Sequence, residues 1–257
     1  MTRPAADVGI FGGSGLYELL AGSEEVEVDS PWGEASARVT IATVGTTRVA
    51  FLPRHGPEHR LPPHRVNYRA NVDVMRRLGV RAILSPFAAG SLQPEIRPGD
   101  LVVVDQFVDR TSGRADTFHD SFDDGPKHAS LADPYDLRLR ALVVGVAREL
   151  GQTVHDGGTV VVVNGPRFST RAESQWFRAA GWQLVNMTQY PEVALACEAG
   201  IPVAGIALVT DYDAGIEGHD HDPVSQEAVF ALFEANVARL RALLLEIAPR
   251  AARLGAP

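Results

Sequence analysis

The stretch IPVAGIALVTDYD, residues Ile201–Asp213, joins an apolar run to two aspartates that lie two positions apart. The run Ile201–Val209 contains no charged or polar side chain, which is typical of a strand buried on both faces in a parallel sheet. Segments of helical period lie between several other apolar runs, so we predict an α/β fold with a mixed, largely parallel twisted β-sheet flanked by α-helices. We expect one domain over residues 1–257. The other predicted strands are Val8–Phe11, Val49–Leu52, Arg81–Phe87, Leu101–Val104, Thr159–Val163 and Gln183–Asn186.

The predicted helices carry recognisable end signals. Thr170 and Glu173 have the spacing of a capping box, and Gly181 is placed to end the helix that follows. A second helix is predicted to end at Gly79. A third, long and amphipathic, follows Asp222 as its N-cap, and we expect its apolar stripe to pack in the core.

Composition limits the partners and the compartment. A net charge of −8 argues against nucleic acid or an anionic membrane surface as the main partner. Cys197 is the only cysteine, so an intramolecular disulfide or a multi-cysteine zinc site is impossible. Apolar runs fall well short of the roughly 20 residues of a membrane span. We therefore expect a cytoplasmic protein.

Two polar segments stand out between the predicted elements. The connection Asp109–Pro134 is long for a compact domain, and structureless loops of that length are uncommon unless they are functional. We interpret it as an active-site or subunit-contact loop. The segment Gly218–Asp222, GHDHD, resembles a metal-ligand cluster, but adjacent side chains diverge. We expect a polar lid or cap there, and no metal site.

Three turns follow predicted strands and carry groups suited to ligands. Gly12–Gly15 with Ser14 would allow close approach of an anion, although its spacing matches neither the dinucleotide fingerprint nor a Walker A loop. Arg54 could hold phosphate in a bidentate manner. Phe168 and Ser169 would lie at the carboxyl end of a strand, where α/β sheets bind ligands. Each of the three also has a purely structural interpretation: the glycines as a tight turn, Arg54 as part of a solvated basic turn, and Phe168 as a core residue.

The aspartates Asp211 and Asp213 would point to one face if the strand continued through them. Two close carboxyl groups raise the pKa of one member, so that one donates a hydrogen bond while the other accepts. This pattern matches the N7 and N6 edge of a 6-aminopurine, whereas a 6-oxopurine would meet a repelling carboxylate. Spacing alone is equally compatible with a capped strand end bearing solvated acids.

Together these pieces resemble the trimeric purine nucleoside phosphorylase superfamily, and most closely its S-methyl-5'-thioadenosine phosphorylase branch. The similarity covers nearly the whole chain, and several motifs occurring in order are more specific than any one alone. The stretches that carry it are GIFGGSGL, PRHGPEHRLPPHRVNYRAN, GSLQPEIRPGDLVVVDQFVDRTSGR, NGPRFSTRAES, NMTQYPEVALACEAGI and ALVTDYD.

The resemblance implies roles for individual residues, with Asp211, Asp213 and Ser169 as the catalytic group. It implies a homotrimer acting on a purine nucleoside and inorganic phosphate, without metal or organic cofactor. Phosphate would be held by Ser14, Arg54, His55, the Ala88 backbone and Thr188. Met187 would contact the ribose, and Phe168, Ser169, Asp211 (at N7) and Asp213 (at N6) would hold adenine. The methylthio pocket would be lined by His59, Pro63 and His128, the last from a neighbouring subunit.

One position departs from the family pattern. Phe87 stands where the phosphate site commonly has a threonine, and a phenylalanine ring cannot donate a hydrogen bond. The expected reaction is phosphorolysis of methylthioadenosine to adenine and 5-methylthioribose 1-phosphate. Two alternatives stay open: a phosphorylase for inosine or 5'-methylthioinosine, and a purine-nucleoside binding protein without catalysis.

Overall fold

The computed structural model describes residues 5–12, 23–123, 125–215 and 224–254. The predictions for Ser14, for most of the glycine turn, for the helix cap at Asp222 and for the Gly218–Asp222 segment lie outside the described residues.

All described strands belong to one mixed sheet, whose neighbours run β2-β3-β4-β1-β5-β10-β9-β7, with β11, β6 and β8 joined through β5. Among the described strands, six pairings are parallel and four antiparallel. The predicted mixed, largely parallel sheet is therefore confirmed. The strands are β1 Val8–Gly12, β2 Glu24–Val26, β3 Val39–Val44, β4 Thr47–Pro53, β5 Ile83–Ser91, β6 Leu101–Val103, β7 Gln106–Arg110, β8 Val154–Asp156, β9 Thr159–Val163, β10 Leu184–Asn186 and β11 Val203–Asp211.

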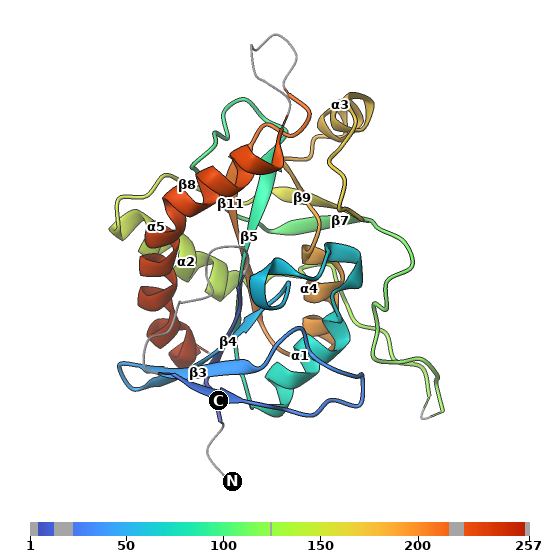
Figure 1. Ribbon diagram of the computed structural model, residues 1–257, viewed down its shortest axis with the longest axis vertical. Helices are drawn as coiled ribbons and strands as arrows, with labels where there is room; N and C mark the ends of the chain where they lie inside the picture. The colour runs from blue at the N-terminus through green and yellow to red at the C-terminus, as the bar shows by residue number, and fades with distance from the viewer. Residues whose placement is uncertain (1–4, 13–22, 124, 216–223, 255–257) are drawn as a thin grey trace.

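Helices cover both faces of this sheet (Figure 1). The helices α2 and α5 share one buried apolar cluster with β1, β6 and β11, and α1 and α4 pack in a second cluster. The α-helices are α1 Tyr68–Arg77, α2 Leu137–Glu149, α3 Arg171–Ala179, α4 Gln189–Glu198 and α5 Gln226–Leu254, with short 3-10 turns at Pro57–His59 and Pro63–Arg65.

The end signals read from the sequence act as predicted in two helices. Thr170 and Glu173 form a complete capping box at α3, and Gly181 follows its C-cap with φ 82°. Helix α1 ends at Arg77, with Gly79 at φ 77° just beyond. In both cases glycine adopts the left-handed conformation that helix C-termini favour.

The centre of the sheet contains a change of neighbour. Strand β5 pairs with β1 at Ile83 and Leu84, whereas farther along the same side it pairs with β10 at Gly90 and Ser91. Because β1 has ended where β10 begins, the carboxyl end of β5 borders a gap between two neighbours. Crevices of this kind at strand ends are the usual ligand sites of α/β sheets.

Strand β11 contradicts one expectation. It ends at Asp211, after an irregularity in its pairing with β5 between Val209 and Asp211. Asp213 lies in the following turn with φ 50°, so strand alternation does not place the two aspartates on one face. The turn brings them together instead, through a hydrogen bond from the Asp213 amide to the Asp211 carboxyl group.

Candidate active site

A cavity of about 420 Å³ lies at the carboxyl ends of β5, β10 and β11 and is closed on one side by the start of α5. Its wall combines buried polar groups with an apolar surface, as ligand sites usually do. The lining includes most of the residues singled out in the sequence: Arg54, His55, His59, Pro63, Phe87, Ala88, Phe168, Ser169, Met187, Thr188, Asp211 and Asp213.

Asp211 is held by its own turn. One carboxyl oxygen accepts a hydrogen bond from the Asp213 amide at 2.7 Å, and the other accepts from the Thr210 hydroxyl at 2.7 Å. Burial raises the pKa of Asp211 to about 6, and the neighbouring Asp213 charge adds to the rise. Near neutral pH this carboxyl group can therefore hold or release a proton.

Asp213 is 4% exposed, and burial raises its pKa as well, against the opposing effect of the nearby Ser174 and Ser169 hydroxyls. Within the described part of the chain, its Oδ2 atom and the Ser169 hydroxyl are buried without a hydrogen-bond partner of good geometry. Buried polar atoms normally have partners, so this pair suits a bound polar ligand.

Gly90 on β5 makes room for the two carboxyl groups. A Cβ atom at this position would lie 2.7 Å from the Oδ1 atom of Asp211 and 3.2 Å from the Cα atom of Asp213. A side chain at residue 90 would displace the aspartate turn.

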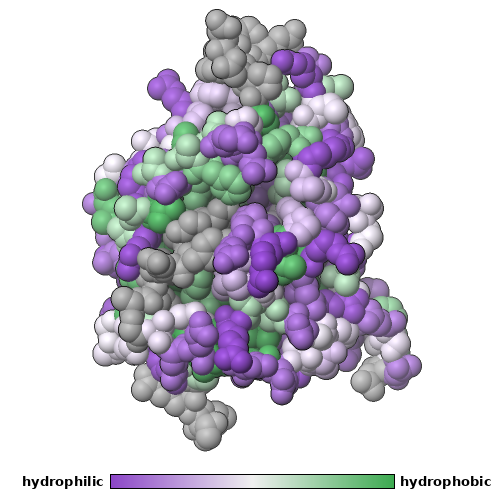
Figure 2. Space-filling model, in the orientation of Figure 1, coloured by the Kyte–Doolittle hydropathy of each residue, from purple (hydrophilic) through white to green (hydrophobic). Residues whose placement is uncertain are grey.

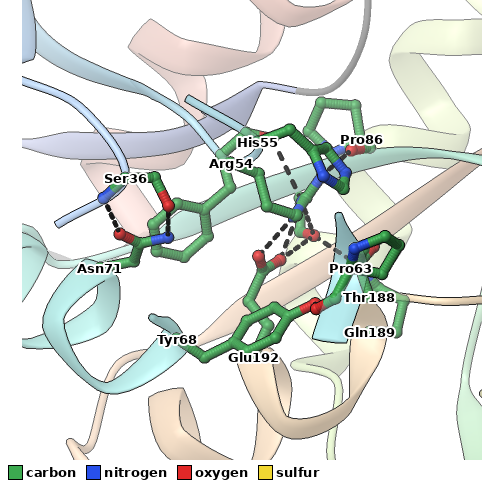
Figure 3. Close-up of polar contacts among 12 residues, drawn as sticks. Ser36, Arg54, His55, Pro63, Tyr68, Asn71, Pro86, Thr188, Gln189 and Glu192 are labelled. Atoms are coloured by element: carbon green, nitrogen blue, oxygen red, sulfur yellow. Dashed lines mark hydrogen bonds and ion pairs between the residues drawn. The ribbon is translucent and has the colours of Figure 1, made fainter. Parts of the chain in front are cut away.

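Arg54 follows β4, is buried and lines the cavity. Figure 3 shows its side chain beside Glu192. Its Nε and Nη2 atoms donate to both oxygens of Glu192 at 2.6 and 2.9 Å, and the side chains of the pair are 1% and 2% exposed. Further hydrogen bonds reach the Pro86 carbonyl and the Ser85 hydroxyl. The bidentate edge is thus bound to a protein carboxylate, which the sequence interpretation of Arg54 as a bidentate phosphate ligand did not foresee.

Two histidines stack beside Arg54. The rings of His55 and His59 lie 4.2 Å apart at 23°, and the Nδ1 atom of His55 is 2.8 Å from the Leu61 carbonyl oxygen. Burial, then the Arg54 charge, lowers the pKa of His55 to about 3 and also lowers that of His59. Both rings are therefore neutral at physiological pH.

Asn186 at the end of β10 organises the opposite wall. Its side-chain oxygen accepts from the amides of Thr188 and Gln189 at 2.7 and 2.8 Å, and its amide donates to the Ala88 carbonyl at 3.0 Å. These bonds fix the Met187–Thr188 turn against β5. Sequence reasoning did not select Asn186, although its place at the end of a predicted strand was a usable signal.

The first turns of α5 complete the cavity with apolar side chains. Val229, Phe230 and Phe233 line it, and the Phe230 ring lies edge-on to His59 at 5.7 Å. Hydrophobic residues also gather on the outer surface over α5 (Figure 2). The stripe of α5 was predicted to be core, which holds for Leu240 and Leu244, whereas its beginning forms part of the site.

The polar connection after β7 is attached to the cavity wall near its start, whereas its later part around His128 does not line the cavity. Near its start, Arg114 donates to the carbonyl oxygens of Asn164 and Met187 at 3.0 and 2.9 Å, so it anchors the loop to the cavity wall. His128 contacts Phe122 within the same loop and does not line the cavity of its own chain.

Among the described residues, no group of three His, Cys, Asp or Glu side chains is arranged to hold a metal ion. No described helix is long and apolar enough to cross a membrane.

The α/β sheet therefore carries, at one strand-end cavity, a carboxyl pair, a buried arginine and an apolar wall, a combination suited to a small ligand with polar and apolar parts. The chain belongs to the phosphorylase superfamily, whose sequence profile matches residues 7–248. It is 53% identical to an S-methyl-5'-thioadenosine phosphorylase of Mycobacterium tuberculosis, over 92% of this chain and 86% of the relative. It is 50% identical to a purine nucleoside phosphorylase of Streptomyces coelicolor, over 94% of this chain and 88% of the relative.

A solved structure agrees over nearly the full length. A mutant adenosine/methylthioadenosine phosphorylase of Schistosoma mansoni, in complex with methylthioadenosine, superposes with a TM-score of 0.86 at 37% identity. The match covers 97% of this chain and 96% of that one.

Proposed function

We propose that the protein catalyses phosphorolysis of S-methyl-5'-thioadenosine, giving adenine and 5-methylthioribose 1-phosphate. The buried Asp211–Asp213 turn carries this proposal, because it offers two carboxyl groups of raised pKa in one cavity. Relatives named for this activity, at 53% and 50% identity, support it.

In this reaction the bond between C1' and the base N9 breaks, and a phosphate oxygen forms the new bond to C1'. The departing base gains electron density, so a proton donated at N7 stabilises the transition state more than the bound substrate. We assign that proton to Asp211, whose pKa of about 6 keeps a protonated fraction near neutral pH. Asp213 accepts from the N6 amino group, and Phe168 and Ser169 hold the base.

The phosphate side of the cavity is assigned to Arg54, His55, the Ala88 backbone and Thr188, all of which line it. Ser14 belongs to this proposal from the sequence resemblance. Met187 contacts the ribose. We propose inorganic phosphate as the only co-substrate, with no metal or organic cofactor, because positioning two bound reactants and protonating the leaving group complete the chemistry.

The 5' end of the nucleoside is assigned to His59 and Pro63, next to the apolar wall from α5. We propose a cytoplasmic homotrimer in which His128 enters the methylthio pocket of a neighbouring subunit. Support comes from the loop itself, which is anchored by Arg114 near the cavity while His128 lies away from it.

The Streptomyces relative named purine nucleoside phosphorylase favours a second candidate, a phosphorylase for 6-oxopurine nucleosides. The paired carboxyl groups oppose it, because a 6-oxo group needs a donor where Asp213 offers an acceptor.

Release of base from methylthioadenosine, measured with and without phosphate, tests the proposed reaction. Phosphate-dependent adenine release with formation of the sugar 1-phosphate supports phosphorolysis. Equal release without phosphate would indicate a hydrolase, and binding without release would indicate a binding protein.

A further inference from the structure

The irregularity in β11 places two consecutive side chains in the same cavity. Along β11 the pairing with β5 passes from Val209 directly to Asp211, so Thr210 is an extra residue in its strand. Consecutive side chains of a regular strand point to opposite faces, whereas an extra residue re-aims one of them. Thr210 and Asp211 accordingly both line the cavity, and Thr210 is only 5% exposed.

The Thr210 hydroxyl group has two acceptors within reach but a single hydrogen to donate. Its Oγ1 atom lies 2.7 Å from the Oδ2 atom of Asp211 and 3.3 Å from the Ala89 carbonyl oxygen. The shorter distance is typical of a hydroxyl group that donates to a charged carboxylate. The two acceptors therefore compete for one hydrogen, and the charge on Asp211 decides which of them receives it.

The second carboxyl oxygen of Asp211 decides where its proton is held. The Oδ1 atom accepts a hydrogen bond from the Asp213 amide at 2.7 Å. In a neutral carboxyl group the unprotonated oxygen is the better acceptor, so the proton belongs on Oδ2. Once Oδ2 is protonated it accepts poorly, and the Thr210 hydrogen turns to the Ala89 carbonyl oxygen. When Oδ2 loses its proton, the Thr210 hydrogen returns to it.

We propose that Thr210 is a positioning residue for the reaction, whose hydroxyl hydrogen turns from the Ala89 carbonyl to Oδ2 of Asp211 as Asp211 gives up its proton. The transferred proton passes from Oδ2 to N7 of the leaving base, while the Thr210 hydrogen stays bonded to Oγ1 and only changes its acceptor. The new carboxylate gains a hydrogen bond that the acid lacked, so the transition state is stabilised more than the bound substrate. This proposal rests on the proposed function, since it concerns the acid assigned to that reaction.

The ionisable groups around Asp211 lie in the aspartate turn, on α3 and after β4. Burial raises the pKa of Asp211 to about 6, the Thr210 hydroxyl and the Asp213 amide oppose the rise, and the Asp213 charge adds to it. On α3, the Glu173 charge acts on Asp213, and Arg171 donates to the carbonyl that follows Asp213 at 3.4 Å. Among the described residues that line the cavity, β5, β10 and α5 contribute no ionisable side chain. The remaining ionisable groups of the lining follow β4 and are Arg54, His55, His59 and Arg60. A substitution at Thr210 leaves all these groups in place.

A titration of the full-length protein without substrate tests the proposal. Thr210→Val removes the hydroxyl group and keeps the shape of the side chain, whereas Thr210→Ser keeps a hydroxyl group. The midpoint at which the Asp211 carboxyl carbon titrates, followed by carbon-13 NMR, should rise by about one pH unit in Thr210→Val. The midpoint should return to the wild-type value in Thr210→Ser. Thr47→Val is the matched control and should not move the midpoint, because Thr47 is also 5% exposed but does not line the cavity.

The pH dependence of turnover gives a second measurement. Below about pH 5, where Asp211 keeps its proton in each variant, kcat for methylthioadenosine at saturating phosphate should fall by about threefold to tenfold in Thr210→Val. The pH above which kcat/KM falls should move up by about one unit, and KM for phosphate should not change. Thr210→Ser should follow the wild type. A packing defect alone would lower turnover without moving the pH profile.

A wild-type midpoint in Thr210→Val, or a profile of Thr210→Ser that follows Thr210→Val, would overturn the proposal. If Thr210→Val does not fold, Thr210→Ala removes the same hydroxyl group and is held to the same outcomes. The titration uses no substrate, so its result does not depend on the reaction. Adenine release that needs no phosphate would instead refute the phosphorylase function itself.

Discussion

Arg54 and Glu192, which are 138 residues apart in the chain, meet through two hydrogen bonds of 2.6 and 2.9 Å between side chains at most 2% exposed. The pair links the end of β4 to helix α4, and Ser85 on β5 joins it through a 2.6 Å hydrogen bond to Glu192. Glu192 therefore holds the Arg54 side chain in the position from which Arg54 is proposed to bind phosphate.

Replacing Glu192 with glutamine should destabilise the fold by about 3–5 kcal/mol, because it leaves the buried Arg54 charge without its partner. The free energy of unfolding in urea measures the effect. Glu27→Gln is a matched control, since its ion pair with Arg38 is exposed on both sides and such pairs contribute about 1 kcal/mol or less. Similar small losses in both variants would show that the buried pair is not a structural requirement.

Replacing Asp211 with asparagine should lower turnover of methylthioadenosine by about 100-fold or more, the range of a general acid. Asp29→Asn, an exposed change in the same chain, should leave turnover unchanged. Circular dichroism and thermal unfolding check that both variants are folded. Turnover near the wild-type value in Asp211→Asn would remove this residue from the acid role.

The pKa of Asp211 also sets a pH dependence. The acid form is present below about pH 6 and is lost as pH rises, so kcat/KM should fall with rising pH above that value.

Because the folded-state pKa of Asp211 lies above the unfolded value of 3.8, this group favours the folded state more at low pH, and its contribution to stability is lost as pH rises through about 6. The free energy of unfolding of Asp211→Asn, relative to that of the wild type, should therefore increase from pH 4 to pH 8. A constant difference would contradict a raised pKa.

Much of this arrangement could be predicted from residue patterns. Strand β9 has the predicted bounds Thr159–Val163, and the capping box of α3 forms as expected, because buried runs and caps are local signals. Strands β2, β3, β7 and β8 were not predicted, because polar residues interrupt their apolar runs. The helices α2 and α4 were not among the predicted elements either.

The site was predictable where residues follow strand ends, and unpredictable where contacts depend on distant segments. Glu192 gave no sequence signal of its bond to Arg54, and the entry of Phe230 into the cavity depends on where α5 packs. Asp213 was found for the wrong geometric reason: a turn with φ 50°, and not strand alternation, brings it to Asp211.

Replacing Gly90 with alanine should strongly reduce activity, because the added methyl group would lie 2.7 Å from the Asp211 carboxyl oxygen. Gly145→Ala in helix α2 is the matched control, since nothing lies within 4 Å of its Cβ position. It should keep activity and gain about 0.5–1 kcal/mol from helix propensity. Equal activity of the two variants would mean that the aspartate turn tolerates displacement.

Replacing His128 with alanine should raise KM for methylthioadenosine, with little change in KM for phosphate, if the loop completes a neighbouring methylthio pocket. Lys127→Ala, the adjacent change, serves as the control. One apolar contact in a substrate pocket changes the free energy that discriminates between substrates by about 1–3 kcal/mol. A KM that does not change would mean that the loop does not reach a site.

The central claim is that Asp211 donates to N7 and Asp213 accepts from a 6-amino group. It is tested most directly by kcat/KM for methylthioadenosine and 5'-methylthioinosine, at saturating phosphate and fixed pH, in the wild type and in Asp213→Asn. We predict at least about 100-fold preference for the amino substrate in the wild type, and a marked shift toward the oxo substrate when asparagine supplies a donor. Equal use of both substrates by the wild type, or a preference for the oxo substrate, would contradict the account.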